Sequence, residues 1–305
     1  MPEKRVAIII LNWNSPTETT GLLDTLEAQP YEDSHTIVID NHSTDDSMEK
    51  LSAYRGTITL IRNEKNLGYA GGNNVGIDTA IDMQADYIWI LNPDIRPTQE
   101  ALSLLVETMD RDASIAAVGP RICYRDHPET VYSDGGLVYP ERGFLVIHKN
   151  TGKTIQELNE PVISSVDYAN GSAILLRSKA LEKIGTFRED FFLYYEETEW
   201  CLRAKRQGWK VCINHDATVY HQSSRKGIRY HYFMARNRIL LARVYGQHCI
   251  PSLKTELSIL HEYTTRPYYP NMLYLCARIA GIVSGVLIHR RKMERGAKHE
   301  LSLFI

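Results

Sequence analysis

The sequence has no paired cysteine motif and no long apolar run. Its five cysteines are widely spaced and form no Cys-x-x-Cys pair, so we expect reduced, mostly buried thiols in a cytosolic compartment. No secretory signal is expected, because the short apolar run at residues 6–11 leads into Asn-Trp-Asn-Ser-Pro instead of a small-residue cleavage site. The run nearest to a transmembrane helix, residues 273–288, is interrupted by Arg278. A disulfide framework and a membrane span are therefore not expected.

Charge is distributed unevenly along a chain of otherwise ordinary globular composition. The 305 residues are 43% hydrophobic, which is enough for one sizeable core or two smaller ones. The chain is net −12 before Ser223 and net +10 from Ser223 onward. Residues 273–288 are followed by the basic run 289–292, which favours contact with an anionic membrane surface. A solvated basic helix face and a buried C-terminal helix are the alternatives, and no nucleic-acid partner is expected.

Strand-like and helix-like segments alternate through the first half of the chain. This alternation predicts an α/β fold, with a mostly parallel central sheet flanked by helices. We expect a first domain at residues 1–222 and a basic, mainly helical C-terminal region at 223–305. Residues 124–163 are turn-rich and have no clear period. The predicted strands are 6–11, 35–40, 57–61, 87–91, 115–120 and 171–176, and the predicted helices are 17–28, 45–54, 72–83, 99–109 and 178–184, with a further helix opening at Glu196.

The apolar strand at residues 87–91 ends on Asn92, Pro93 and Asp94. Pro93 has no N–H to donate to a sheet, so the strand stops there. Asp94 then lies at the carboxyl end of a strand, the edge at which open α/β sheets bind ligands. A carboxylate beside an amide suits a divalent cation that carries substrate phosphates. A strand-to-helix turn, in which Asn92 and Asp94 cap backbone groups, is equally consistent with these residues alone.

Three carboxylates follow an aromatic run in the second half. Glu196, Glu197 and Glu199 come directly after Phe-Phe-Leu-Tyr-Tyr at residues 191–195. Acidic residues in the first turn of a helix are stabilised by its dipole, which is one explanation. The other is a proton acceptor at the wall of an apolar pocket, ionised at neutral pH.

Several motifs follow one another along residues 6–245. They are Val-Ala-Ile-Ile-Ile-Leu-Asn-Trp-Asn-Ser from Val6, Val-Ile-Asp-Asn-His-Ser-Thr-Asp from Val38, Asn-Leu-Gly-Tyr-Ala-Gly-Gly-Asn-Asn-Val-Gly from Asn66, Leu-Asn-Pro-Asp from Leu91, the Glu196-Glu197 pair, and His221. Taken in this order, they resemble the inverting nucleotide-sugar glycosyltransferases of GT-A fold, in the large family that includes bacterial rhamnosyl- and galactofuranosyltransferases. The resemblance implies a Rossmann-like nucleotide-binding half and a helical C-terminal extension.

The resemblance assigns binding of the donor's nucleotide to two motifs, the one that begins at Val38 and the one that begins at Asn66. Asp40 matches the carboxylate that accepts a hydrogen bond from the imide nitrogen of uracil or thymine, and Ser43 and Asp45 would shape the base and ribose pocket. The loop from Asn66 to Asn74, with Gly68 in it, would line the nucleotide. A dinucleotide-binding loop competes for this segment, but its glycines lack the G-x-G-x-x-G spacing after a strand, so an oxidoreductase is discounted.

The resemblance also implies a divalent cation. Asp94 and His221 match metal ligands, while Asn92 replaces the first carboxylate of the Asp-x-Asp motif. A site with one carboxylate fewer is expected to be weak until the donor's diphosphate completes it. An imidazole ligand favours Mn²⁺ over Mg²⁺ somewhat.

Catalysis is assigned to the acidic pair. Glu197 aligns with a base that is usually the aspartate of Glu-Asp, and Glu196 is the alternative base. Arg236 lies where the family often carries a basic segment near the phosphates, although a solvated arginine on a helix is as good an explanation. The implied mechanism is one in-line displacement that inverts the anomeric carbon.

The expected activity is transfer of a sugar, with rhamnose favoured, from a dTDP- or UDP-sugar to a lipid-linked or polysaccharide acceptor in cell-surface glycan synthesis. The expected location is the cytoplasm, peripheral on the inner face of the cytoplasmic membrane. A nucleotide-sugar-binding protein with degraded catalysis is one alternative. A nucleotidyltransferase is another, but Asn-Trp-Asn-Ser-Pro at residues 12–16 replaces the glycine-rich, lysine-containing loop that such an enzyme needs.

Overall fold

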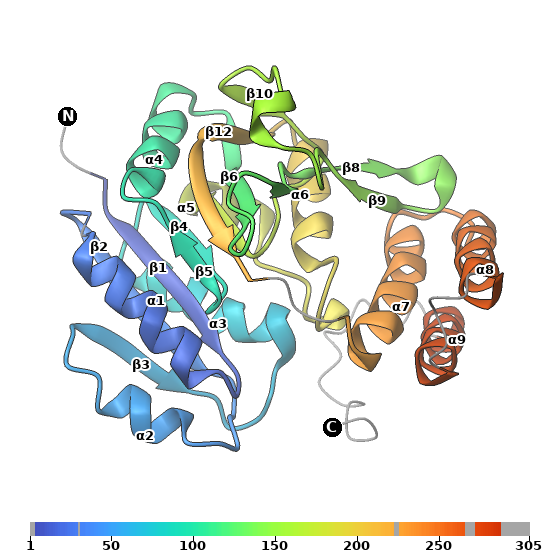
Figure 1. The fold of residues 1–305 in the computed structure, drawn as a ribbon, viewed down its shortest axis with the longest axis horizontal. Coiled ribbons are helices and arrows are strands. Elements are labelled where there is room, and N and C mark those ends of the chain that lie inside the picture. The colour runs from blue at the N-terminus through green and yellow to red at the C-terminus, as the bar shows by residue number, and fades with distance from the viewer. Residues whose placement is uncertain (1–3, 30, 223–225, 266–271, 288–305) are drawn as a thin grey trace. The chain divides into compact units, whose positions relative to one another are not determined.

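The computed structural model describes residues 4–29, 31–222, 226–265 and 272–287 (Figure 1). Contacts group the described residues into two units. The first unit holds residues up to Leu137, then His148–Phe187, and the described residues from Glu197 to 222. The second holds Val138–Ile147, Arg188–Glu196 and the described residues from 226 onward. The prediction of domains at 1–222 and 223–305 stays a prediction.

A mixed sheet, mostly parallel, forms the centre of the first unit (Figure 1). Its main path runs β10-β12-β6-β11-β4-β1-β2-β3. Strands β1 to β4 are mutually parallel, β6 is parallel to β12, and β11 is antiparallel to both β4 and β6. This confirms the predicted fold class. The strands are β1 (Val6–Asn12), β2 (Ser34–Asp40), β3 (Ile58–Arg62), β4 (Tyr87–Leu91), β6 (Ile115–Tyr124), β10 (Ile163–Ser165), β11 (Ala173–Arg177) and β12 (Lys210–His221), with β5 (Ile95–Pro97) paired to β12 and β7 (Val131–Ser133) paired to β6.

Helices pack against this sheet and enclose its core. Every residue of β4 is buried, as its continuous apolar run predicts for a central strand. Trp89 lies in the same apolar cluster as Leu105 of the following helix and Leu175 of β11. The helices of this unit are α1 (Pro16–Ala28), α2 (Ser47–Ser52), α3 (Gly68–Asp82), α4 (Ala101–Arg111), α5 (Ser178–Ile184) and α6 (Glu196–Arg206). The first residue of α6, Glu196, is grouped with the second unit, and the rest of the helix belongs to the first.

The predicted elements agree closely with the observed ones. The strand at 87–91 and the helix at 178–184 have the predicted bounds, and the other predicted elements are present with ends shifted by a few residues. The turn-rich segment contains short elements that periodicity did not reveal, namely β7, β8 (Gly136–Tyr139), η1 (Pro140–Arg142), β9 (Leu145–His148), η2 (Ile155–Glu157) and β10. All five cysteines are free, and three of them are buried.

The second unit is mainly helical. It contains η3 (Glu189–Phe191), α7 (Ile228–Val244), α8 (Ile250–Thr265) and α9 (Met272–Leu287). One carboxylate, Glu256 of α8, pairs with Arg238 of α7 and Arg278 of α9 at 2.7 Å each, and all three side chains are buried. Within the described ranges, no helix has the length and apolar character needed to cross a membrane.

Candidate active site

Polar side chains gather where parallel strands of the first unit end. In the sheet register Asn12 lies opposite Asp40, and Ile10 lies opposite Leu91. The last residues of β1 and β2 and the Asn92–Asp94 segment after β4 therefore share one edge of the sheet. This is the edge at which open α/β folds bind ligands.

Asp40 organises the β1 and β2 end of this edge. Its carboxylate is completely buried and accepts hydrogen bonds from Nδ2 of Asn12 at 2.9 Å and from the backbone N–H of Ser43 at 3.2 Å. The Asn12 amide also donates to Oγ of Ser43 at 3.1 Å, and its Oδ1 accepts from Thr19 at 2.8 Å. Nε of Arg62 lies 3.8 Å from the Asp40 carboxylate. Asp40 thus fixes the turn in which Ser43 lies.

Asp45 lies on the exposed side of the same turn. Its Oδ1 accepts from the N–H of Ser47 at 3.1 Å and from Oγ of Ser47 at 2.5 Å, at the start of α2. This is a helix-starting contact, so the structure gives Asp45 a local role beside its predicted one.

Asn41 holds the glycine-containing loop. Its Nδ2 donates to Oδ1 of Asn66 and to the carbonyl of Gly68, each at 3.1 Å, while its Oδ1 accepts from the N–H of Leu67 at 3.0 Å. Gly68 has a φ of 73°, which favours glycine. Asn74 faces elsewhere, because both ends of its amide bond the backbone of Phe187 at 2.9 and 3.0 Å.

Asp94 and His221 meet because β5 pairs with β12. Ile95 lies opposite His221 in that antiparallel register, which places Asp94 beside the imidazole. Nε2 of His221 is 3.4 Å from Oδ2 of Asp94. The ring of Tyr132 stacks on the imidazole of His221, with the two ring centroids 4.7 Å apart.

This pair fits a divalent cation. Burial lowers the pKa of His221, so its imidazole is neutral at pH 7 and can act as a ligand. Burial raises the pKa of Asp94, and the neighbouring His221 opposes that rise. Neighbouring ligand atoms of an octahedral site with bonds of about 2.1 Å lie about 3.0 Å apart, close to the observed separation. Among the described residues, no group of three or more His, Cys, Asp or Glu could hold a metal.

Asn92 is fixed by the turn before β11. Its backbone N–H donates to the carbonyl of Ser172 at 2.9 Å, and its Nδ2 donates to Oγ of Ser172 at 3.2 Å. The next residue back along that turn, Gly171, approaches Glu197. A Cβ added to Gly171 would lie 3.3 Å from Cγ of Glu197. The turn at residues 170–172 therefore connects the Asn92–Asp94 segment to the start of α6.

Glu197 has the electrostatics of a proton acceptor. Burial raises the pKa of its carboxyl to about 7, although the backbone N–H groups of Glu197 and Thr198 favour the ionised form and oppose the rise. A carboxyl with such a pKa is ionised in part at neutral pH and accepts a proton there. Glu196, the alternative base, is buried at the first position of the same helix.

Arg236 belongs to α7 in the second unit. Its guanidinium donates to the carbonyls of Asp190 and Phe191 at 2.8 and 3.4 Å. Its predicted role near the donor phosphates stays a prediction.

Residues 7–185 of this chain match the family model described as "Glycosyl transferase family 2". The chain belongs to glycosyl transferase family 2. Among relatives, the low-salt glycan biosynthesis hexosyltransferase Agl10 of Haloferax volcanii is 27% identical over 303 residues, covering 95% of this chain and 94% of that protein. The dTDP-rhamnosyl transferase RfbF of Shigella flexneri is 28% identical over 225 residues, covering 68% of this chain and 71% of that protein. An N-acetylglucosaminyl-diphospho-decaprenol L-rhamnosyltransferase of Mycobacterium tuberculosis is 26% identical over 205 residues, covering 62% and 66%.

Solved structures agree with the GT-A fold. GalNAc-T7 with UDP, GalNAc and Mn²⁺ has a TM-score of 0.64 at 12% identity, and the match covers 97% of this chain and 58% of that one. The mannosyltransferase PcManGT from Pyrobaculum calidifontis, with GDP-Man and Mn²⁺, has a TM-score of 0.58 at 14% identity over 96% of this chain and 78% of that one. This family 2 protein is a glycosyltransferase, and the predictions of family, fold and enzyme class are confirmed.

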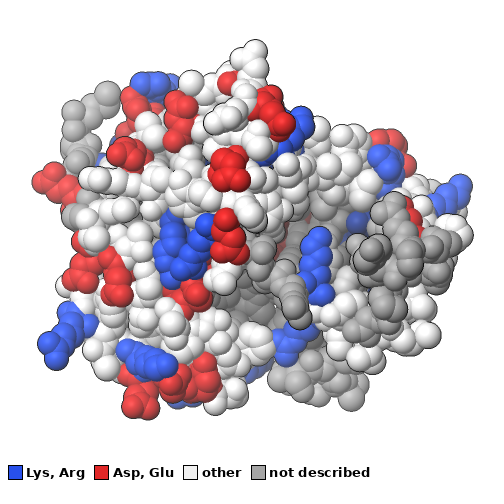
Figure 2. All heavy atoms as spheres, in the orientation of Figure 1, with Lys and Arg blue, Asp and Glu red and all other residues white. Residues whose placement is uncertain are grey.

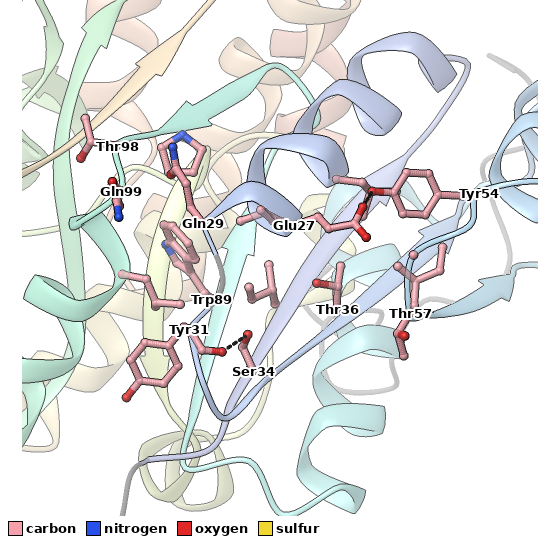
Figure 3. Close-up of a pocket in the computed structure, with 17 residues that line it drawn as sticks. Glu27, Gln29, Tyr31, Ser34, Thr36, Tyr54, Thr57, Trp89, Thr98 and Gln99 are labelled. Carbon is pink, nitrogen blue, oxygen red and sulfur yellow. Dashed lines mark hydrogen bonds between the residues drawn. The ribbon is translucent and has the colours of Figure 1, made fainter.

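A pocket of about 260 Å³ lies elsewhere in the first unit of this glycosyltransferase (Figure 3). It is lined by Glu27 of α1, by Ser34 and Thr36 of β2, and by Thr57 just before β3, with Trp89 among the other lining residues. Those strand positions are at the opposite end of β2 and β3 from Asp40. None of the predicted site residues lines this pocket, so we do not assign the donor to it.

Four residues that contact the candidate site were not predicted from the sequence: Asn12, Asn41, Ser172 and Tyr132. Asn12 and Asn41 each directly follow a predicted strand, which was a usable signal. Ser172 follows Asn-Gly, a common turn dipeptide. Nothing in the sequence pattern points to the stacking of Tyr132 on His221, because that contact depends on the pairing of distant strands.

Proposed function

We propose that this glycosyltransferase is metal-dependent and inverting, and that it moves a sugar, with rhamnose favoured, from a dTDP- or UDP-sugar to a hydroxyl of a lipid-linked or polysaccharide acceptor. The observation that carries the proposal is the turn at residues 170–172, which contacts Asn92 through Ser172 and Glu197 through Gly171. The names of the relatives support the sugar and acceptor classes.

Asp94 and His221 hold the divalent cation, Mn²⁺ or Mg²⁺. When bound, the cation neutralises charge that develops on the departing nucleoside diphosphate. Asn92 carries no charge, so the cation's affinity depends strongly on diphosphate oxygens that complete the ligand set. The neutral imidazole of His221 is consistent with a Mn²⁺ preference.

Glu197 accepts the proton of the acceptor hydroxyl as that oxygen forms a bond to the anomeric carbon. The bond from the anomeric carbon to the diphosphate oxygen breaks in the same step, and the diphosphate leaves with the electron pair. Attack from the face opposite the leaving group inverts the configuration. Glu196 is the second candidate for the base, since it immediately precedes Glu197 at the start of α6.

The nucleoside lies along the end of β1 and β2. Asp40, Ser43 and Asp45 form the base and ribose side. The segment from Asn66 to Asn74, which is helical from Gly68 onward as the start of α3, forms the facing side. Because the Asp40 carboxylate is completely buried, a uracil or thymine imide reaches it only after the turn at His42 and Ser43 shifts. His42 in that turn has a positive φ of 63° and is exposed.

The acceptor is presented at an anionic membrane surface on the cytoplasmic side, with the protein bound peripherally. Helix α9 supports this part of the proposal, because its exposed face is entirely apolar. The exposed residues of α9 are Met272, Leu273, Cys276, Ile279, Ala280, Val283, Val286 and Leu287. We call these eight residues the apolar face of α9.

A donor panel with purified protein tests the proposed chemistry. dTDP-rhamnose, UDP-galactofuranose and other UDP-hexoses are incubated with Mn²⁺ or Mg²⁺ and with lipid-diphosphate-linked sugar acceptors. We expect metal-dependent release of the nucleoside diphosphate and a product of inverted anomeric configuration. Asp94→Asn should lower transfer by about 10²-fold, in line with the loss of a metal ligand or its support, and chelation should abolish it.

Two exposed positions provide matched controls. Asp24→Asn on α1 and Glu182→Gln on α5 remove the same charges as Asp94→Asn and Glu197→Gln at exposed sites. Both controls should retain wild-type transfer. Donor binding without transfer for every acceptor, or full activity of Asp94→Asn in the presence of chelator, would contradict the proposal.

A further inference from the structure

The segment that leads into α6 has a strained backbone. Three of its non-glycine residues have positive φ: Phe192 at 63°, Tyr194 at 67° and Tyr195 at 73°. Phe192 has a ψ of −56°, and the N–H of Leu193 donates to the carbonyl of Phe191 at 2.7 Å. These are the angles and the hydrogen bond of a γ-turn of the rare, strained kind. Such conformations persist only where surrounding contacts enforce them, and they concentrate at functional sites.

One buried amide supplies those contacts. Asn237 of α7 is completely buried, and its Nδ2 donates to three carbonyls of the segment: Phe191 at 2.9 Å, Leu193 at 2.8 Å and Tyr194 at 2.7 Å. Asn237 and the segment belong to the same unit. A single side chain therefore bonds the backbone on both sides of the γ-turn and next to Tyr195.

The neighbouring arginine fixes which way this amide points. Nη1 of Arg236 donates to Oδ1 of Asn237, and a guanidinium can only donate. The amide oxygen must therefore face Arg236, and the NH₂ group must face the three carbonyls. Nη2 of Arg236 adds a bond to the carbonyl of Asp190 at 2.8 Å, and the ring of Phe192 stacks on Phe233 of α7 at 5.3 Å.

We propose that Asn237 is a positioning residue for catalysis: it holds the strained segment at residues 191–195 and thereby sets where Glu196 and Glu197 begin α6. The segment is continuous with the two carboxylates, since Tyr195 directly precedes Glu196. Asn237 acts through the backbone and does not itself touch the reacting atoms. The proposal rests on the proposed function for the role of Glu197 and adds what holds that residue in place.

Asn237→Asp is the sharpest test, because it keeps the size of the side chain and replaces its donors by acceptors. A carboxylate at this position repels the three carbonyls, so the segment is released and Glu197 shifts. We expect kcat to fall by about 10²-fold, the scale of a 1 Å misplacement, while the KM for the donor changes little. The apparent pKa of the acid limb, in the profile of kcat/KM against pH, should also fall below that of the wild type, because a displaced carboxyl loses part of its burial.

Asn214→Asp is the matched control. Asn214 on β12 is likewise buried, and its Nδ2 donates to Oγ1 of Thr108 and the carbonyl of Leu104 at 2.8 and 3.3 Å. The substitution removes comparable buried hydrogen bonds without touching the segment at 191–195. We expect lower thermal stability, with the same acid limb and nearly the same kcat as the wild type.

Amide hydrogen exchange gives a readout that does not depend on activity. Exchange at residues 191–196 should rise in Asn237→Asp and stay at the wild-type level in Asn214→Asp. If the wild type transfers no sugar, the proposed function fails, while the exchange measurement still tests how the segment is held. If Asn237→Asp does not fold, Asn237→Ala removes the donors without adding charge and is measured in the same way. Wild-type kcat, acid limb and exchange in a folded Asn237 variant, or the same changes in Asn214→Asp, would overturn the proposal.

Discussion

The ionisation of Glu197 makes pH the most direct probe of the proposed base. Burial raises the pKa of this carboxyl to about 7, and only the ionised form accepts a proton. We therefore expect kcat/KM to rise with pH through an acid limb near 7 and to level off above it. Glu197→Gln should lower kcat by about 10²- to 10⁴-fold, the usual contribution of a general base, with donor affinity retained. Initial rates from pH 5 to 9 measure both effects, and a flat profile in the wild type would reject Glu197 as the base.

The same carboxyl links stability to pH in the opposite direction. The folded chain keeps a proton on Glu197 up to a pKa of about 7, whereas an unfolded glutamate releases it near 4.3. The contribution of this group to the free energy of unfolding is thus fully present below about pH 4.3 and is lost as the pH rises through 7. We expect the free energy of unfolding, measured with urea, to fall less in Glu197→Gln than in the wild type as the pH rises from about 4.3 through 7. Parallel curves would show that Glu197 is not buried in solution.

The sequence indicated the charged residues of the site better than the amides that hold them. Asp94 and His221 were predicted as a pair, and the structure places them 3.4 Å apart. Asn12 and Asn41 at least follow predicted strands. Asn237 bonds three carbonyls of a distant segment, and such contacts leave no local pattern in a sequence. Asn74 was predicted to line the donor, yet both ends of its amide bond the backbone of Phe187. An asparagine in a motif can serve either purpose, and only the fold distinguishes them.

At the scale of elements, the turn at residues 170–172 is the connection most open to test. Gly171→Ala would add a Cβ 3.3 Å from Cγ of Glu197, so Glu197 has to move by a few tenths of an ångström. We expect transfer to slow by about tenfold, less than for complete misplacement, with little change in thermal stability. Gly227→Ala is the control, because an added Cβ there meets nothing within 4 Å and the φ of −85° suits alanine. Equal rates of sugar transfer for the two variants would show that the turn at residues 170–172 does not affect Glu197.

The parallel strands were predictable because each is a short apolar run between turn signals. Strand β4 reads Tyr-Ile-Trp-Ile-Leu and is buried throughout, as expected for a strand covered on both faces. Strands β5 and β12 were not predicted. β5 has three residues, too few to show a period, and β12 carries polar side chains such as Asn214 and His215 in its buried middle. The pairing of these two strands creates the Asp94–His221 contact, so the proposed metal site depends on the elements that periodicity missed.

Three helices of the second unit converge on one buried carboxylate. Glu256 lies between Arg238 and Arg278 at 2.7 Å from each. Glu256→Gln would remove the carboxylate that two buried guanidiniums share, and breaking a buried ion pair typically destabilises by about 3–5 kcal/mol. We expect a loss of that order in the free energy of unfolding, measured with urea. Glu182→Gln on the surface of α5 should be neutral, and a similarly small effect of Glu256→Gln would show that water reaches the triad.

At the scale of the whole chain, charge and apolar surface are separated along the sequence. On the described surface of the first unit drawn in Figure 2, acidic and basic side chains are interspersed. Helix α9 has the reverse of the usual arrangement, since its exposed residues are apolar while Arg278 is buried. Gly281 and Gly285 allow its inner face to lie close to the backbone of α7, where an added Cβ would meet the carbonyls of Tyr232 and Arg236 at 2.2 and 2.9 Å. A helix packed this way holds its apolar face outward.

Binding to lipid vesicles tests whether the apolar face of α9 meets a membrane. Val283→Glu places a charge in the centre of that face, at a side chain 50% exposed, and Val162→Glu makes the same change at a side chain 52% exposed in the first unit. Because burying a charge at the lipid interface is unfavourable, Val283→Glu should reduce co-sedimentation with anionic vesicles severalfold, and Val162→Glu should leave it unchanged. Binding of the wild type should weaken with added salt and on neutral vesicles, since the basic residues after position 288 contribute by charge. Equal partition to anionic and neutral vesicles would show that charge does not contribute to binding. Vesicle binding at the wild-type level by Val283→Glu would show that α9 does not contact the membrane.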